Sequence, residues 1–147
     1  MPSLRLAVLS AAILVAGGCG SPDSPEAQVR QIVDRMETAA EERDVGDLMG
    51  FVSGDFRDAY GQDSQEMSRY IRGYFIANQS IRLLTRINRI DFPLPDEART
   101  QITVAMVGRE ADAATAWNLA ADLHEFDVTL RKEDGEWKVT YAKWRRD

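Results

Sequence analysis

The single histidine of the chain, His124, is the residue best suited to acid–base chemistry. Imidazole side chains exchange protons near neutral pH, and histidine is the commonest general base in enzymes. Alternation along the surrounding sequence places His124 on the same inward strand face as Phe126, close to the start of that strand. His124 is therefore a candidate general base, with a partly exposed structural histidine as the alternative.

No other catalytic or metal-binding pattern accompanies this histidine. The sequence has no His-x-Glu, Gly-x-Ser-x-Gly, phosphate-loop or EF-hand spacing. One cysteine and one histidine exclude a zinc cage built from those residues and an intramolecular disulfide, and they disfavour a Cys–His nucleophile pair. We expect neither a metal site nor a cofactor.

Several aromatic side chains could line a pocket and stack on a flat ligand. Most of them lie on the apolar stripe of an expected helix or on the inward face of an expected strand, where plain core packing is the alternative reading. The candidate lining residues are Tyr74, Trp117, Phe126, Trp137 and Tyr141.

The first twenty residues have the pattern of a targeting segment. Arg5 precedes the apolar run Leu6–Ala16, which is half of the roughly 20 residues that a membrane-spanning helix needs. The sequence Val15-Ala16-Gly17-Gly18-Cys19 resembles the lipobox of bacterial lipoproteins, in which the cysteine is diacylated and the chain is cut before it. A cleaved signal peptide with a chance cysteine is the alternative.

This resemblance divides the chain into a lipoprotein signal peptide over 1–18, the lipidated Cys19 with a polar tether over 19–25, and a folded domain over 26–147. Two or three acyl chains would hold the protein on the membrane, because one chain alone binds marginally. Gly20 stands where Asp usually marks inner-membrane retention in Gram-negative lipoproteins. The resemblance therefore implies the outer membrane, with the domain facing the periplasm.

The charge balance excludes one class of partner. The chain has a formal charge of −6, which becomes −7 when Arg5 is lost with the signal peptide. Phosphate contacts need a basic face, so nucleic acid is not an expected partner. An acidic domain also gains nothing from anionic lipids, which leaves the anchoring to the acyl chains.

Three helices are expected first along the chain. The first begins with Ser24 as the N-cap and Pro25 in the first helical position, and an apolar stripe follows at spacings of three and four. A shorter helix covers Val45–Val52, after which Ser53-Gly54-Asp55 forms a turn cluster. The third helix opens at Ser64 and has the clearest periodicity in the chain.

Two strands are expected in the next part of the chain. Residues 80–92 fit a strand that prolines 93 and 95 end, although the arginines in this stretch also share one helical face. Residues 98–109 alternate clearly and form the second strand. Residues 110–122, which contain Trp117, form either a short helix or an irregular strand entry.

The last two strands are expected to form a hairpin. The dipeptide Asp134-Gly135 is typical of a two-residue turn with positive φ. This turn predicts a register in which the apolar faces of the two strands coincide. The expected pairs are Leu130 with Val139, Val128 with Tyr141, and Lys132 with Trp137.

The predicted order gives an α+β fold with three N-terminal helices packed in a mainly antiparallel four-stranded sheet. The sequences Arg43-Asp44-Val45-Gly46-Asp47-Leu48 and Asp55-Phe56-Arg57-Asp58 look like the opening of a nuclear transport factor 2-like domain. The closing hairpin, with its Gly-x-Trp-x-Val run at residues 135–139, resembles the end of that domain. The resemblance implies a strongly curved, cone-like sheet with a pocket inside.

Members of this superfamily include the ketosteroid isomerase and scytalone dehydratase enzymes as well as many non-enzymatic domains, so the fold does not decide the function. We favour a non-catalytic module that binds a small apolar ligand or a protein partner. The face of the sheet that bears Trp144 is a candidate homodimer surface. The alternatives are a small-molecule isomerase, dehydratase or hydrolase that uses His124 or a pocket tyrosine, and a structural subunit of an envelope complex.

Overall fold

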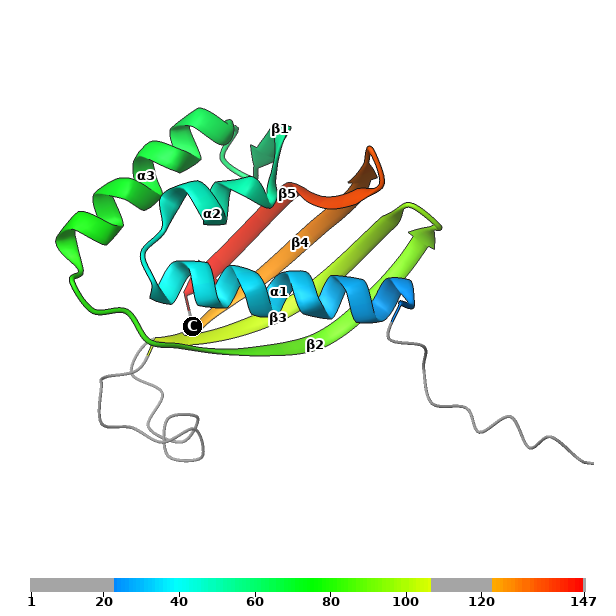
Figure 1. Cartoon of the computed structure of the whole chain (residues 1–147), viewed down its shortest axis with the longest axis horizontal. Coiled ribbons are helices and arrows are strands. Elements are labelled where there is room, and N and C mark those ends of the chain that lie inside the picture. Colours follow the sequence, from blue (N-terminus) through cyan, green and yellow to red (C-terminus); the bar gives the residue numbers. More distant parts are fainter. Residues whose placement is uncertain (1–22, 107–122, 147) are drawn as a thin grey trace, which may run out of the picture.

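The computed structural model describes residues 23–106 and 123–146. Within these ranges the chain forms two helices, a strand, a third helix and four further strands (Figure 1). The helices lie on one face of a single sheet, as expected for an α+β fold. The signal peptide, Cys19 and Trp117 lie outside the described residues.

Helix α1 (Pro25–Glu41) begins as the sequence predicts. The side chain of Ser24 accepts a hydrogen bond from the backbone N–H of Ala27 at 3.1 Å, and Pro25 occupies the first turn, where a missing N–H costs nothing. Val29 and Val33 are buried on the face that is turned to the sheet. None of the described helices is long and apolar enough to cross a membrane.

The second predicted helix is shorter than expected, and a strand follows it. Helix α2 (Val45–Gly50) is capped by Asp44, and strand β1 (Val52–Asp58) runs parallel to the last strand of the chain. The prediction of a turn at Ser53-Gly54-Asp55 is therefore wrong. Local turn signals are outweighed here by pairing with a strand some eighty positions later and by burial of Phe56 in the core.

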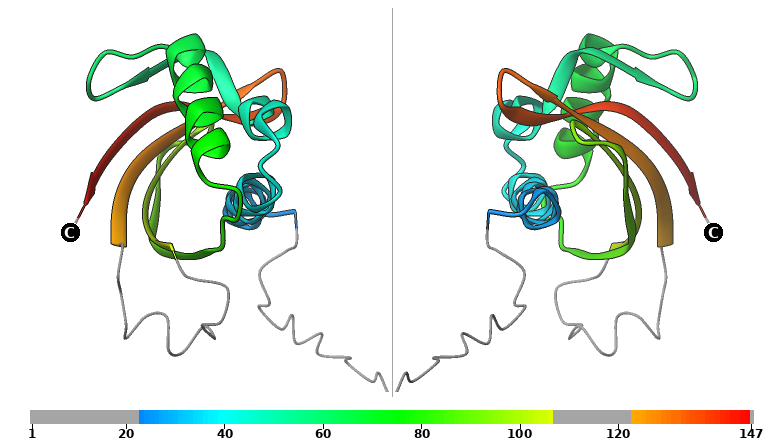
Figure 2. Two further views of the ribbon diagram at one scale, coloured as in Figure 1. Left: turned by 90° about the vertical axis from the view of Figure 1, so that its left-hand side faces the viewer. Right: turned by 90° about the vertical axis from the view of Figure 1, so that its right-hand side faces the viewer.

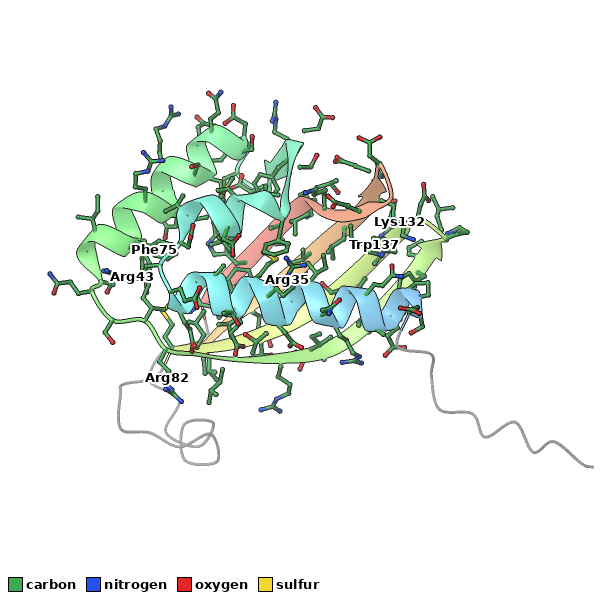
Figure 3. All side chains as sticks on the ribbon, viewed as in Figure 1. Arg35, Arg43, Phe75, Arg82, Lys132 and Trp137 are labelled. Atoms are coloured by element: carbon green, nitrogen blue, oxygen red, sulfur yellow. The ribbon has the colours of Figure 1, made fainter. Side chains whose placement is uncertain are left out.

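Helix α3 (Ser64–Ala77) also begins where the sequence predicts. Asp63 accepts a hydrogen bond from the backbone N–H of Glu66, while the Glu66 side chain accepts one from the N–H of Asp63. This reciprocal arrangement satisfies two backbone donors that the first turn would otherwise leave unpaired. At its other end, the guanidinium of Arg43 donates to the carbonyl oxygen of Phe75 at 3.2 Å (Figure 3).

The sheet has five strands in the order β1-β5-β4-β3-β2, rather than the four that were predicted. All neighbouring strands are antiparallel except β1 and β5, which makes the sheet mixed. The remaining strands are β2 (Leu83–Leu94), β3 (Glu97–Met106), β4 (Leu123–Glu133) and β5 (Glu136–Arg146). The helices are likewise not consecutive, because β1 separates α2 from α3.

Strand β2 continues past the position at which it was expected to end. Pro93 lies inside it, where the pairing with β3 is irregular between Asp91 and Leu94. The strand lies at the edge of the sheet and has a hydrogen-bonded neighbour on one side only. A proline, which has no N–H to donate, can therefore be accommodated there.

The hairpin between β4 and β5 confirms part of the predicted register. Leu130 pairs with Val139 and Lys132 with Trp137, around a turn in which Asp134 and Gly135 both have positive φ. Beyond Leu130 a β-bulge shifts the register, so that Thr129 pairs with Tyr141 and Val128 pairs with Ala142. The predicted pair of Val128 with Tyr141 is therefore wrong, because a bulge adds one residue to β5 and reverses the faces that follow.

The sheet is strongly curved and bends around the helices on its concave side (Figure 2). The main core cluster, which includes Phe56, Leu130 and Trp137, fills the space between them. The indole N–H of Trp137 donates to Gln28 Oε1 at 2.9 Å and so joins β5 to α1. The amino group of Lys132 lies 5.5 Å from the centre of the Trp137 ring (Figure 3).

Candidate functional site

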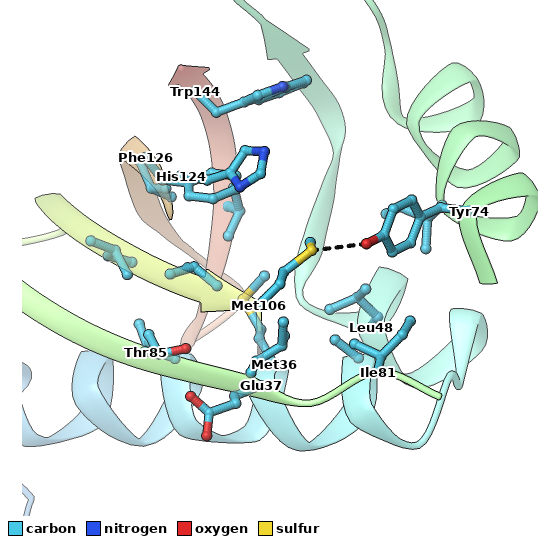
Figure 4. Close-up of a pocket in the computed structure, with 18 of the residues that line it drawn as sticks. Met36, Glu37, Leu48, Tyr74, Ile81, Thr85, Met106, His124, Phe126 and Trp144 are labelled. Atoms are coloured by element: carbon cyan, nitrogen blue, oxygen red, sulfur yellow. Dashed lines mark hydrogen bonds between the residues drawn. The ribbon is translucent and has the colours of Figure 1, made fainter. Parts of the chain in front are cut away.

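A cavity of about 410 Å³ lies between the concave face of the sheet and the helices (Figure 4). This volume falls in the range of small-molecule sites, which are mostly apolar with a few polar groups. Among the described residues, the wall is apolar apart from the indole of Trp144 and five other polar side chains. These five are Glu37, Tyr70, Tyr74, Thr85 and His124.

The sheet supplies one wall through rows of side chains that face each other across neighbouring strands. Thr85 pairs with Val104, and Val104 pairs with His124, so these three side chains form one row across β2, β3 and β4. Because alternate residues of a strand point to the same face, the next row starts two positions away. It contains Ile102, Phe126 and Trp144.

The helices supply the opposite wall at helical spacing. Helix α3 contributes Met67, Tyr70, Ile71, Tyr74 and Phe75, which recur at intervals of three and four and therefore share one face. Helix α1 contributes a second such stripe, which consists of Val33, Met36, Glu37 and Ala40. The cavity is thus built by the amphipathic patterns that identify both helices in the sequence.

The hydroxyl group of Tyr74 crosses from the helical wall to the sheet. It donates a hydrogen bond to the sulfur of Met106 at 2.9 Å (Figure 4). A thioether is a weak acceptor, so a ligand oxygen at this position would be a better partner for the same hydroxyl. Tyr74 is therefore a donor that a bound molecule could recruit.

The imidazole of His124 lies within an aromatic wall. Its ring centre is 6.4 Å from that of Phe126, which in turn lies 6.2 Å from Trp144. The Trp144 ring is packed edge-on against Tyr60, which is exposed. Atom Nδ1 of His124 is buried and has no hydrogen-bond partner in residues 23–106 and 123–146.

The predicted pocket residues separate into three groups. Tyr74 and Phe126 line the cavity, as does His124. Trp137 does not line it, because the ring is packed in the core and its N–H is bonded to Gln28. Trp117 lies outside the described residues, and nothing tests its predicted place.

Tyr141 and Trp144 exchange the places that the sequence predicted for them. The β-bulge in β5 turns Tyr141 to the outer face, where it is 37% exposed, and turns Trp144 into the cavity wall. A signal for this is the change of parity in β5, where the apolar residues 137, 139 and 141 are followed by 142 and 144. The prediction of Tyr141 as a lining residue and of Trp144 on the exposed face is wrong.

The described residues do not assemble a catalytic pair around His124. No carboxylate among them is hydrogen-bonded to the imidazole, and Glu37 is the carboxylate that reaches the cavity wall from another element. In the same part of the chain, no group of three or more His, Cys, Asp or Glu side chains is placed to hold a metal ion. The arrangement offers hydrogen bonds and apolar contacts to a ligand.

A second hollow lies on the outer face of the sheet and is lined by polar and charged groups. Here the carboxylate of the buried Glu97 accepts hydrogen bonds from Arg99 at 3.1 Å and from Arg131 at 3.0 Å. Ser53 and Glu133 are bonded to each other beside it. The Glu97 carboxylate thus pairs with two arginines of the same sheet, which favours a structural role for this group.

Comparison with known proteins places the fold but not the family. No family model matches the chain, and no curated protein matches it. Solved structures do match over most of its length. A putative scytalone dehydratase from Novosphingobium aromaticivorans superposes with a TM-score of 0.67 at 14% identity, covering 83% of this chain and 83% of that one.

Two further structures have the same architecture. An NTF2-like protein of unknown function from Shewanella baltica superposes with a TM-score of 0.61 at 12% identity, covering 83% of this chain and 93% of that one. A hexachlorocyclohexane dehydrochlorinase from Novosphingobium barchaimii gives 0.64 at 12% identity, with 83% and 86% covered. The described domain therefore has the NTF2-like fold, which is shared by enzymes and by proteins of unknown function.

Proposed function

We propose that this chain is a lipid-anchored envelope protein whose domain binds a small, largely apolar molecule without transforming it. The observation that supports this proposal is the cavity of about 410 Å³, whose wall is apolar except for a few separated polar groups. Tyr74 and His124 line that space from opposite walls, and the hydroxyl of Tyr74 can donate a hydrogen bond within it. Such a site favours an apolar body with one or two polar atoms.

A titration with a neutral apolar fluorophore tests this proposal. The segment from Ser21 onward contains every described helix and strand, since these lie between Pro25 and Arg146. N-phenyl-1-naphthylamine added to this segment should show saturable binding with a gain in fluorescence. Val104→Trp, which fills the middle of the cavity wall, should abolish binding, and Thr85→Phe serves as a second filling variant.

The matched control is Gln101→Trp, which places the same bulky side chain on the outer face of the same strand. It should leave binding intact, and circular dichroism should show that all variants fold. Binding that persists in both filling variants, or that is absent from the wild-type domain, would contradict the proposal.

The anchoring part of the proposal derives from the sequence. The lipobox-like run Val15–Cys19 and the short polar tether would hold the domain at the periplasmic side of the outer membrane through acyl chains on Cys19. The domain would then sample ligands at the membrane surface. Trp144 lies in the cavity wall and therefore does not support a homodimer surface on the outer face of the sheet.

Catalysis is the second candidate function, and one observation favours it. His124 lines the cavity and its Nδ1 has no hydrogen-bond partner in the described ranges, so a substrate in the cavity would lie beside an imidazole that no described residue fixes through that atom. Two of the structures with this fold carry names of lyase-type enzymes, a putative scytalone dehydratase and a dehydrochlorinase. If His124→Ala abolishes turnover of a substrate found by screening while the domain still binds it, the catalytic function is supported; unchanged turnover removes its basis.

A further inference from the structure

Glu37 lies at the edge of the cavity between α1 and β2, where its carboxylate points away from Tyr74 and His124 (Figure 4). No other carboxylate is among the described residues that line the cavity. On a helix, the side chains three and four positions away are the neighbours that could pair with it. Those positions are Val33, Asp34, Ala40 and Glu41, none of which is basic. Glu37 makes no hydrogen bond or ion pair with any residue in the described ranges.

A second carboxylate lies one turn further along the same helix. Glu41 Oε1 accepts a hydrogen bond from the backbone N–H of Leu83 at 2.8 Å, which fixes it against the start of β2. Leu83 lines the cavity. The seam between α1 and β2, defined here by Glu37, Glu41 and Leu83, therefore carries two carboxylates next to the apolar space. The negative potential of Glu37 is therefore reinforced along this edge.

The nearby arginines do not neutralise this edge. Arg35 lies over the Phe51 ring at 5.0 Å, and Arg43 is bonded to carbonyl oxygens at the end of α3. The guanidinium of Arg82 points away from α1 (Figure 3), and Arg86 lies on the outer face of β2, because its neighbour Thr85 lines the cavity. No lysine or arginine is among the described residues that line the cavity.

The charge of Glu37 should influence which ligands the cavity accepts. An anionic ligand would meet Glu37 with no compensating charge, whereas a cation would gain attraction in a region partly shielded from water. Charge should therefore discriminate between ligands of equal size and apolar surface.

We infer that the cavity selects lipophilic amines, molecules with a protonated amino group on an apolar body, and that Glu37 supplies the counter-charge. This inference rests on the proposed function, since it names the class of ligand that the same cavity takes. The apolar body would lie against Ile102 and Phe126, and the ammonium group would lie at the seam between α1 and β2.

Three probes that share one ring system test the inference by calorimetry on the domain from Ser21 onward. They are 2-naphthylmethylamine, 2-naphthylmethanol and 2-naphthoate, which differ in charge and little in shape. At neutral pH and low salt the amine should bind about tenfold more tightly than the alcohol, and the carboxylate should bind most weakly. Glu37→Gln should reduce amine affinity to that of the alcohol and leave the alcohol unchanged.

Asp34→Asn is the matched control, because Asp34 is an exposed carboxylate on the same helix that does not line the cavity. It should preserve the preference for the amine. Equal affinity of the three probes, or a preference that survives Glu37→Gln, would overturn the inference and leave the proposed function standing. If neither the amine nor the alcohol binds at millimolar concentration, both fail.

Discussion

Tyr74 on α3 and Met106 at the end of β3 are joined by a hydrogen bond of 2.9 Å from the phenol hydroxyl to the thioether sulfur. The two residues lie 32 positions apart in the sequence, and both line the cavity. The bond links the helical wall of the cavity to the sheet. Its acceptor, a thioether sulfur, is a weak one. A polar ligand atom would therefore compete with this sulfur for the hydroxyl.

We predict that this bond contributes little to folding. Tyr74→Phe and Met106→Leu should each lower the free energy of unfolding by no more than about 1 kcal/mol, because a neutral hydrogen bond has a small net value. Denaturation with urea measures each variant and the double variant. A coupling energy above about 2 kcal/mol in that double-mutant cycle would contradict the view that Tyr74 is readily recruited by a ligand.

The ion pairs of Glu97 predict which of two variants loses more folding stability. Its side chain is 6% exposed, whereas those of Arg99 and Arg131 are 64% and 61% exposed. Glu97→Gln leaves two cations that water can solvate and should cost about 1–3 kcal/mol. The double variant Arg99→Gln, Arg131→Gln leaves a buried carboxylate without its partners and should cost more. The reverse order in chemical denaturation would show that Glu97 is not buried in solution.

Asp63 predicts a specific pH dependence. The backbone N–H of Glu66 donates to its carboxylate and, with Arg57 and Arg69 nearby, lowers the pKa of Asp63 below its ordinary value of 3.8. A carboxyl group with a lowered pKa in the folded state stabilises the fold above its unfolded pKa, and this contribution is lost as the pH falls through the folded pKa. The cap on α3 should therefore weaken in acid.

The measurement for this cap is thermal unfolding from pH 7 to pH 2. Asp63→Ala should unfold at a lower temperature than the wild type at neutral pH, and the difference should shrink below about pH 4. Asp63→Asn is the control, since an amide oxygen caps a helix without titrating. If the difference between wild type and Asp63→Ala stays constant with pH, the carboxylate is not what caps α3.

The helices could be predicted from the sequence because their signals are local. Ser24 with Pro25, and Ser64 after Asp63, mark helix starts that the structure confirms, and the apolar stripes of α1 and α3 become the helical wall of the cavity. The α+β class and the antiparallel hairpin at Asp134-Gly135 follow from equally local patterns.

The errors arise where distant pairing decides the structure. Strand β1 looks like a turn until it is placed beside β5, and nothing near Gly54 indicates that partner. The β-bulge in β5 is a change of one residue, yet it moves Tyr141 out of the cavity and Trp144 into it. A site that depends on strand parity is therefore the part of this molecule that sequence reasoning predicts least well.

The anchor is tested independently of the cavity. Cells that express the full chain and are fed a radiolabelled fatty acid should label the wild-type protein, and Cys19→Ser should abolish the label. Asp23→Ser serves as a control in the tether that leaves the cysteine in place. Labelling that persists in Cys19→Ser would refute lipidation at Cys19, while the ligand-binding proposal would be unaffected.

The most direct test of the central claim is a native mass spectrum of the domain from Ser21 onward, purified without added ligand. An open apolar cavity of about 410 Å³ should carry a molecule from the cell, seen as a reproducible extra mass that is absent from Val104→Trp and present in Gln101→Trp. A bare protein that also gains no mass when N-phenyl-1-naphthylamine is added would contradict the claim that this cavity is a binding site.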